Sequence, residues 1–178
     1  GSVDETNAAL SHYPAIYRQK WAALMHQKFG LKTDHEVDLD LFADFFTLLQ
    51  SNHADFTLSF RHLSKLSNQK STKDELLRDL FLDRDSLDAW LDNYRARLTM
   101  EQSDEQARQT SMLSVNPKYI LRNYLAQIAI EKAQKKDFSE VRKLFHILEN
   151  PYDEQEEHED YAKLPPDWAR HLEVSCSS

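Results

Sequence analysis

The chain has 178 residues, of which 40% are apolar and 29% charged, a composition typical of a folded domain with one core. Gly1 and Gly30 are its two glycines, which excludes a glycine-rich phosphate loop and a dinucleotide-binding fingerprint. The net charge of -8 argues against a general nucleic-acid surface, and no apolar run is long enough to predict a membrane span.

The N-terminal half predicts a series of amphipathic helices. We interpret Gly1 and Ser2 as a cloning scar, and we expect the first helix to begin near Pro14 and to end at Gly30. Two further helices are expected over 38–50 and 55–66. The apolar positions that recur at helical spacing in these three segments are Ile16, Trp21, Leu24, Met25, Phe29, Leu39, Phe42, Phe46, Leu49, Phe56, Phe60 and Leu63.

The middle of the chain continues in the same way. Ser71 or Thr72 can cap a short helix over 73–82, and 83–100 predicts a longer helix with acids first and arginines last, as the helix dipole favours. The polar stretch 101–115 is interpreted as a helix followed by a turn. The predicted core positions of the longer helix are Leu87, Trp90, Leu91, Tyr94 and Leu98.

Asn116 and Pro117 have the pattern of an N-cap followed by proline at the first helical position, so a helix is predicted from Asn116 to about Gln134. Asp137 and Glu140 resemble a capping box in front of a last helix over 138–148. The predicted fold is all-α, with about seven helices in a helical domain over 3–150. Residues 151–178 are expected to form an irregular tail with three prolines, a short helix at 166–173 and Cys176 near its end.

Charge changes sign between the last helices and this tail. We expect the acidic tail to fold back on the basic segment, with most of the docking energy supplied by burial of Tyr152, Tyr161, Leu164 and Trp168. The basic residues of 116–145 are Lys118, Arg122, Lys132, Lys135, Lys136, Arg142 and Lys143. The acids of the tail are Asp153, Glu154, Glu156, Glu157, Glu159, Asp160, Asp167 and Glu173.

Candidate chemistry is sparse. The eight histidines are scattered without a metal-binding spacing, and the acidic run 153–160 is interpreted as a solvated segment, so no metal ligand is predicted. Cys176 is the single cysteine, which excludes an internal disulfide and favours a reducing compartment. From the residues alone, its thiol is either inert or able to exchange with a second cysteine.

Three ordered segments resemble the C-terminal end of the SelO family, also called YdiU or UPF0061. They are NPKYILRNYLAQIAIEKAQKKDFSEV from Asn116, NPYDEQ from Asn150, and YAKLPPDWARHLEVSCSS from Tyr161. The resemblance implies a parent pseudokinase that transfers AMP from ATP to protein hydroxyl groups (AMPylation) with Mg²⁺ or Mn²⁺. The lysine, glutamate, aspartate and metal-binding residues of that family belong to a kinase-like core, and no position here matches them.

The resemblance therefore predicts no catalytic, cofactor-binding or metal-binding residue in this fragment. Its expected partners are the kinase-like core of the same chain and the protein substrates of the parent, without nucleic acid or membrane. Cys176 corresponds to a position where family members carry selenocysteine or cysteine, which implies a regulatory disulfide with the core and, for cysteine, a bacterial cytoplasmic source. The alternative is a free-standing helical module that binds another protein and has no catalytic activity.

Overall fold

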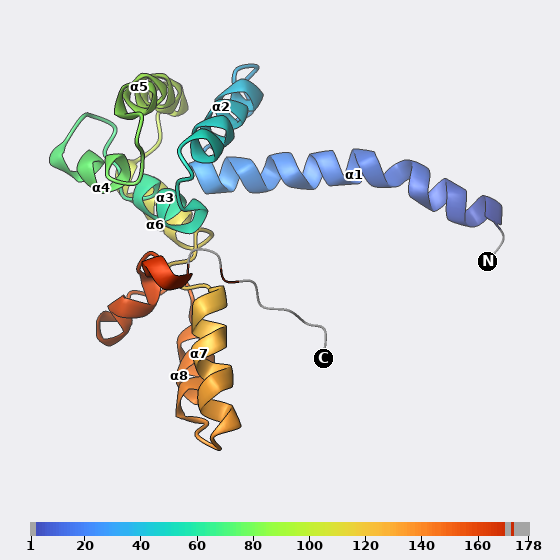
Figure 1. Cartoon of the computed structure of the whole chain (residues 1–178). Coiled ribbons are helices and arrows are strands. Elements are labelled where there is room, and N and C mark those ends of the chain that lie inside the picture. The colour runs from blue at the N-terminus through green and yellow to red at the C-terminus, as the bar shows by residue number, and fades with distance from the viewer. Residues whose placement is uncertain (1–2, 170–171, 173–178) are drawn as a thin grey trace.

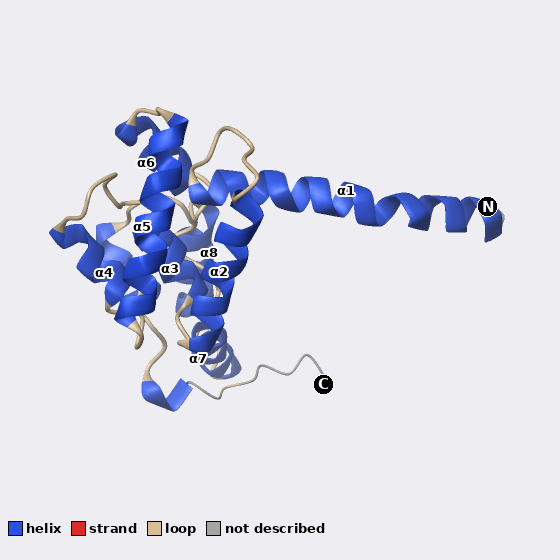
Figure 2. Ribbon diagram, turned by 90° about the horizontal axis from the view of Figure 1, so that it is seen from above, coloured by secondary structure: helices blue, strands red, loops and turns tan. Residues whose placement is uncertain are grey.

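The structure is a computed structural model that describes residues 3–169 and 172, with side chains described from His12 onward. Within these residues there are eight α-helices, three short 3-10 helices and no strand, which confirms the all-α prediction (Figure 2). None of the helices in this part of the chain is long and apolar enough to cross a membrane.

The α-helices are α1 (Val3–Phe29), α2 (Asp38–Ser51), α3 (Phe56–Leu63), α4 (Glu75–Arg78), α5 (Arg84–Glu101), α6 (Glu105–Leu113), α7 (Asn123–Gln134) and α8 (Ser139–Glu149). The 3-10 helices are η1 (Thr72–Asp74), η2 (Glu156–Ala162) and η3 (Asp167–Ala169). Helices α1 to α6 form one body, and α7 and α8 lie side by side and project from it (Figure 1).

Aromatic rings build the core of the first body. Phe29, at the end of α1, is fully buried, and its ring centroid lies 4.6 Å from that of Phe42 and 5.1 Å from that of Phe60. The ring of Phe45 lies tilted against that of Trp90 of α5, with 4.4 Å between the ring centroids. Full burial of such a side chain contributes about 1.5–3 kcal/mol, so these rings hold α1, α2, α3 and α5 together.

The polar atoms of the buried aromatic residues have partners. Trp90 donates its indole N–H to the carbonyl of Leu41 at 2.9 Å, and the Tyr94 hydroxyl donates to the carbonyl of Phe29 at 2.7 Å. Burial raises the pKa of Tyr94 to about 12. Both bonds tie α5 to the neighbouring helices and satisfy the polar atoms of these two rings.

Gly30 ends α1, as predicted. Its φ of +70° lies in the left-handed region, and the amides of Gly30 and Leu31 donate to the carbonyls of Gln27 and His26, the pattern of a Schellman cap. A Cβ at this position would lie 2.6 Å from the sulfur of Met112. Conformation and space therefore both require glycine here.

Two predicted helix starts are wrong. Helix α1 begins at Val3 and contains Pro14, which has no N–H to donate to the preceding turn. Helix α7 begins at Asn123, whereas Asn116 and Pro117 belong to an irregular segment. The side chain of Asn116 is fully buried among other elements, so tertiary contacts replace its predicted role as a cap.

The predicted core face of α2 is partly wrong. Phe42 and Leu49 are buried as expected, but Leu41 and Phe45 are buried in place of Leu39, which is exposed. The reason is that α2 packs against α5 on one side and the Phe29 ring on the other, so its buried arc is wider and rotated from the predicted stripe.

The tail packs on α7 and α8 through small apolar contacts. Ala162 lies with Ile147 in one cluster, and Ala169 lies with Leu125 and Leu144 in another. Three of the four residues that were expected to dock it are exposed: Tyr152 by 43%, Leu164 by 52% and Trp168 by 60%. Tyr161 packs against both clusters, and the ring of Trp168 makes an edge contact with Tyr124, with 6.2 Å between the ring centroids.

A buried ion-pair network supports the first body. Arg97 of α5 is 2% exposed and donates through Nε to Asp38 at 2.6 Å, while its Nη1 lies 2.7 Å from a carboxylate oxygen of Glu101. Asp38 also contacts Nε2 of His26 at 2.9 Å. Burial raises the pKa of Asp38, and the hydrogen bonds from Arg97 and His26 outweigh it, so the pKa lies below its usual value.

We predict that Asp38→Asn lowers the free energy of unfolding by about 3 kcal/mol, because removal of one partner leaves a buried guanidinium incompletely paired. Urea titration followed by circular dichroism measures the change. Asp40→Asn is the control, since Asp40 is exposed on the same helix and should change stability by less than about 0.5 kcal/mol. Equal effects of the two substitutions would show that the network contributes nothing.

Candidate functional site

The predicted site residue, Cys176, lies outside the described residues, as does His171. What the structure does describe is the junction that fixes the tail before it reaches Cys176. This junction consists of Arg61 from α3, Lys65 from the turn after it, Lys118 from the irregular segment before α7, and Glu154 and Glu159 from the tail.

Arg61 is the centre of the junction. Its side chain is 4% exposed, and Nη1 donates to the carbonyls of Leu113 at 3.1 Å and Asn116 at 2.9 Å. Nη2 donates to the carbonyl of Tyr152 and to a carboxylate oxygen of Glu154, both at 2.9 Å. One guanidinium therefore joins α3, the end of α6, the segment before α7 and the tail.

Glu154 receives three cations. Besides Arg61, Lys65 donates to it at 2.8 Å and Lys118 at 2.5 Å, and Lys118 also pairs with Glu159. Burial by itself raises the pKa of Glu154, and the hydrogen bonds from these three cations outweigh it, so its pKa falls to about 2. The carboxylate is thus charged at neutral pH and fixes the tail to two separate elements.

Asn116 and Asp55 brace the same region. The side-chain amide of Asn116 donates to the carbonyl of Lys28 at 2.9 Å and to the Ser64 hydroxyl at 3.0 Å. Asp55 caps α3 by accepting from the amide of Leu58, and it accepts two bonds from Arg122, at 2.6 and 3.2 Å. The burial of Asn116 and the pairing of Arg122 position α7 against the first body.

Ion pairs hold the tail, as the charge pattern predicted, but only some of the expected basic residues take part in them. Lys118 pairs with the tail as expected. Arg122 pairs with Asp55, and Lys132 pairs with Glu140 of α8. Lys143, also in the predicted segment, lies over the ring of Tyr161. Arg61 and Lys65 bind the tail as well. Sequence reasoning missed them because they lie 50 residues or more before the basic segment that it considered.

A hollow of about 400 Å³ opens beside the junction, with Leu58, Leu80 and Leu164 among its apolar walls. His62 also lines it, and burial, followed by the charges of Lys65 and Arg61, lowers the pKa of this histidine. Because the nearby cations are already bound to Glu154, the hollow offers a small apolar surface with a neutral imidazole at neutral pH.

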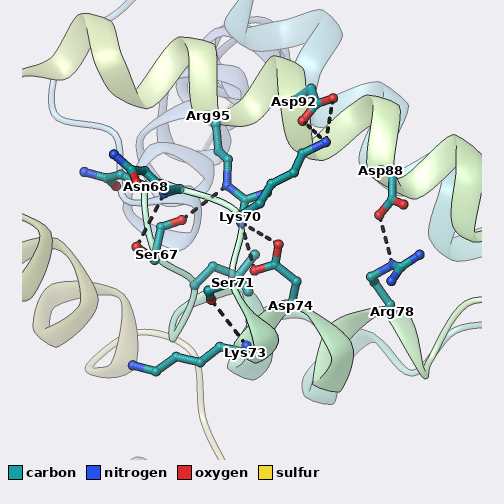
Figure 3. A network of polar contacts seen from close by, with 12 residues as sticks. Ser67, Asn68, Lys70, Ser71, Lys73, Asp74, Arg78, Asp88, Asp92 and Arg95 are labelled. Carbon is teal, nitrogen blue, oxygen red and sulfur yellow. Dashed lines mark hydrogen bonds and ion pairs between the residues drawn. The ribbon is translucent and has the colours of Figure 1, made fainter.

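A second polar cluster links α4 to α5 (Figure 3). Arg95 donates through Nη2 to both carboxylate oxygens of Asp74 at 2.8 Å, and Lys70 lies 2.9 Å from Asp92. Arg78 lies 3.0 Å from Asp88. These residues surround a hollow of about 380 Å³, apart from Asp92, which lies outside it.

The residues of this cluster do not fit ATP with a divalent metal. Its three cations are each paired with a carboxylate, so a triphosphate would have to displace internal partners. Within residues 3–169, no group of three or more histidine, cysteine, aspartate or glutamate side chains is arranged to hold a metal ion. The cluster is therefore assigned to fixing the 67–74 loop against α5.

Comparison with known proteins identifies close relatives. A sequence profile of the family described as "Protein adenylyltransferase SelO" matches residues 2–149. The chain is 58% identical over all 178 residues to "Protein nucleotidyltransferase YdiU" of Herminiimonas arsenicoxydans and covers 36% of it. It is 49% identical over 177 residues, 99% of the chain, to the proteins of that name from Burkholderia ambifaria (strain MC40-6) and Burkholderia lata, and covers 34% of each. The chain thus spans about a third of the length of these relatives.

We predict that Glu154→Gln loosens the tail. The neutral amide loses the three charge-assisted bonds. We expect this to cost about 1 kcal/mol, the upper end for an ion pair that solvent screens. That free energy corresponds to about fivefold faster cleavage within 152–169 during limited proteolysis. Glu156→Gln, two residues further along the tail and exposed, is the matched control. Unchanged cleavage in Glu154→Gln would show that the junction does not hold the tail.

The same carboxylate gives a pH dependence with a defined sign. A depressed pKa stabilises the folded state above the unfolded pKa, near 4.5, and this contribution is lost as the pH falls toward the folded pKa of about 2. Amide-exchange protection of 152–162, corrected for the intrinsic rate, should hold from about pH 7 to 5 and decline below. Glu154→Gln should lack this part of the decline, and an identical profile in both proteins would contradict the assignment.

Proposed function

The chain belongs to the SelO family of protein adenylyltransferases, and we propose that it is the C-terminal helical region of an enzyme that transfers AMP from ATP to hydroxyl groups of proteins. The observation that carries the proposal is the combination of coverage and length. Relatives named for nucleotidyl transfer match this chain from end to end, and the chain makes up only about a third of them. This combination also favours a part of a larger enzyme over a free-standing interaction module.

Within that enzyme, the region serves as a support for the kinase-like core, which contributes the residues that bind ATP with Mg²⁺ or Mn²⁺. Two features of the fold support this division of labour. The buried cations Arg61, Arg95 and Arg97 are all paired with carboxylates of the same region, so they stabilise it and are not available to a nucleotide. The exposed apolar side chains of α1 and α8 leave faces that a larger protein can cover.

The tail adds a regulatory element to this proposal. The junction at Glu154 anchors the chain 22 residues before Cys176, so the segment that leads to the thiol begins at a fixed point on the helical region. Oxidation would join Cys176 to a cysteine of the core: a peroxide accepts two electrons, both thiols lose their protons, and a disulfide forms. The bacterial relatives and the single cysteine support a role in the reducing cytoplasm of a bacterium.

We predict that the full-length parent transfers label from ATP carrying radioactive α-phosphate to protein, whereas this 178-residue chain alone does not, because it supplies no nucleotide site. Autoradiography of protein bands after incubation with Mg²⁺ or Mn²⁺ measures transfer. A parallel reaction of the parent with ATP labelled at the γ-phosphate is the control for phosphoryl transfer. Labelling by the 178-residue chain alone would contradict the proposed division of labour.

We also predict that Cys176→Ser in the full-length parent leaves AMP transfer intact under reducing conditions and removes its sensitivity to hydrogen peroxide. Ser175→Ala, which keeps the thiol, is the control and should retain the sensitivity of the parent. If Cys176→Ser remained as sensitive as the parent, the regulatory role of this thiol would be ruled out.

A further inference from the structure

Helix α1 extends far beyond the body to which it belongs. Only its C-terminal end packs, where Met25 and Phe29 are buried and the helix contacts α3 and α6. The N-terminal half points away from all other helices in both views (Figures 1 and 2).

This projecting half has little reason to be helical by itself. A helix shorter than about 12–15 residues is marginal in water when nothing packs against it. Pro14 lies within this half and removes a backbone hydrogen bond, at a cost of about 3 kcal/mol in a helix interior. A helical conformation here therefore requires packing that the described residues do not supply.

The exposed apolar side chains of this half lie on one side of the helix. Tyr13, Tyr17 and Leu24 are spaced four and seven residues apart, so they lie along one line of α1, with Ile16 beside them. Their exposed fractions are 63%, 55%, 43% and 55% in the order Tyr13, Tyr17, Leu24 and Ile16. The rings of Tyr13 and Tyr17 stack at 6.1 Å and form a continuous apolar surface. We define these four residues as the α1 face.

The charge around the α1 face is positive although the chain as a whole is negative. No aspartate or glutamate occurs between residues 12 and 33, and Arg18 and Lys20 are exposed next to the face. Within the described residues neither of them takes part in an ion pair. An apolar surface with acidic residues at its edge is the complement of this arrangement.

We propose that the α1 face docks onto the kinase-like core of the same full-length chain, on an apolar surface with an acidic edge. The proposal rests on the proposed function in so far as the chain is part of a longer protein. The relatives contain enough additional chain to form such a surface, because close to two thirds of each of them lies outside the matched region. A second copy is a poorer occupant, since a two-fold pairing of this face would bring Arg18 and Lys20 against the same cations.

Amide hydrogen exchange followed by mass spectrometry tests the proposal in the full-length protein. Peptides covering 13–24 should exchange at least tenfold more slowly in the full-length protein than in the 178-residue chain, because the core covers the helix. Equal exchange rates in the two proteins would overturn the proposal. The readout does not depend on AMP transfer, so a protected α1 in an inactive protein would sink the proposed activity and leave the docking face in place.

Variants identify the surface that is responsible. Tyr17→Asp in the full-length protein should abolish the protection of 13–24, and Arg18→Glu with Lys20→Glu should reduce it without touching the apolar residues. Leu82→Asp is the matched control, because Leu82 is 87% exposed on another part of the region and should leave α1 protected. Protection that appears only at high protein concentration, or only with phospholipid vesicles, would assign the face to a second copy or to a membrane and overturn the proposal.

Discussion

The arrangement of this region depends on the guanidinium of Arg61. It is almost fully buried, and its four described acceptors come from two separate stretches of chain: Leu113 and Asn116 at and just after the end of α6, and Tyr152 and Glu154 in the tail. A buried cation is stable only when its donors are satisfied. The position of α7, α8 and the tail relative to the aromatic core therefore follows from the need to pair one arginine on α3.

Buried cations are paired with carboxylates elsewhere in the fold as well. Arg97 is paired with Asp38 and Glu101, and Arg95 with Asp74, while Glu154 collects three cations. Because these charges serve the fold, the buried cations are not available to other proteins, whereas the exposed apolar side chains of α1 and α8 are. That is the character expected of a region that packs against a larger catalytic core, and the identity shared with nucleotidyltransferases along the whole chain agrees with it.

Local signals in the sequence predicted much of this fold, and tertiary interactions account for the misses. Gly30 and the cap at Ser71 could be placed because turn and cap chemistry acts over a few residues. Asn116 has the same local pattern as a cap, but its amide is buried between Lys28 and Ser64. In the sequence Arg61 has the pattern of an ordinary polar position of a helix. Three of its acceptors are backbone carbonyls and the fourth is Glu154, 93 residues away, so no local pattern predicts them.

The central claim is that this region and the kinase-like core form one folded unit. Differential scanning calorimetry of the full-length parent beside the 178-residue chain tests it most directly. The account predicts one cooperative transition in the parent, at a higher temperature than that of the isolated region, because docking stabilises both partners. A separate transition in the parent at the temperature of the isolated region would show that the two fold independently, and it would contradict the account.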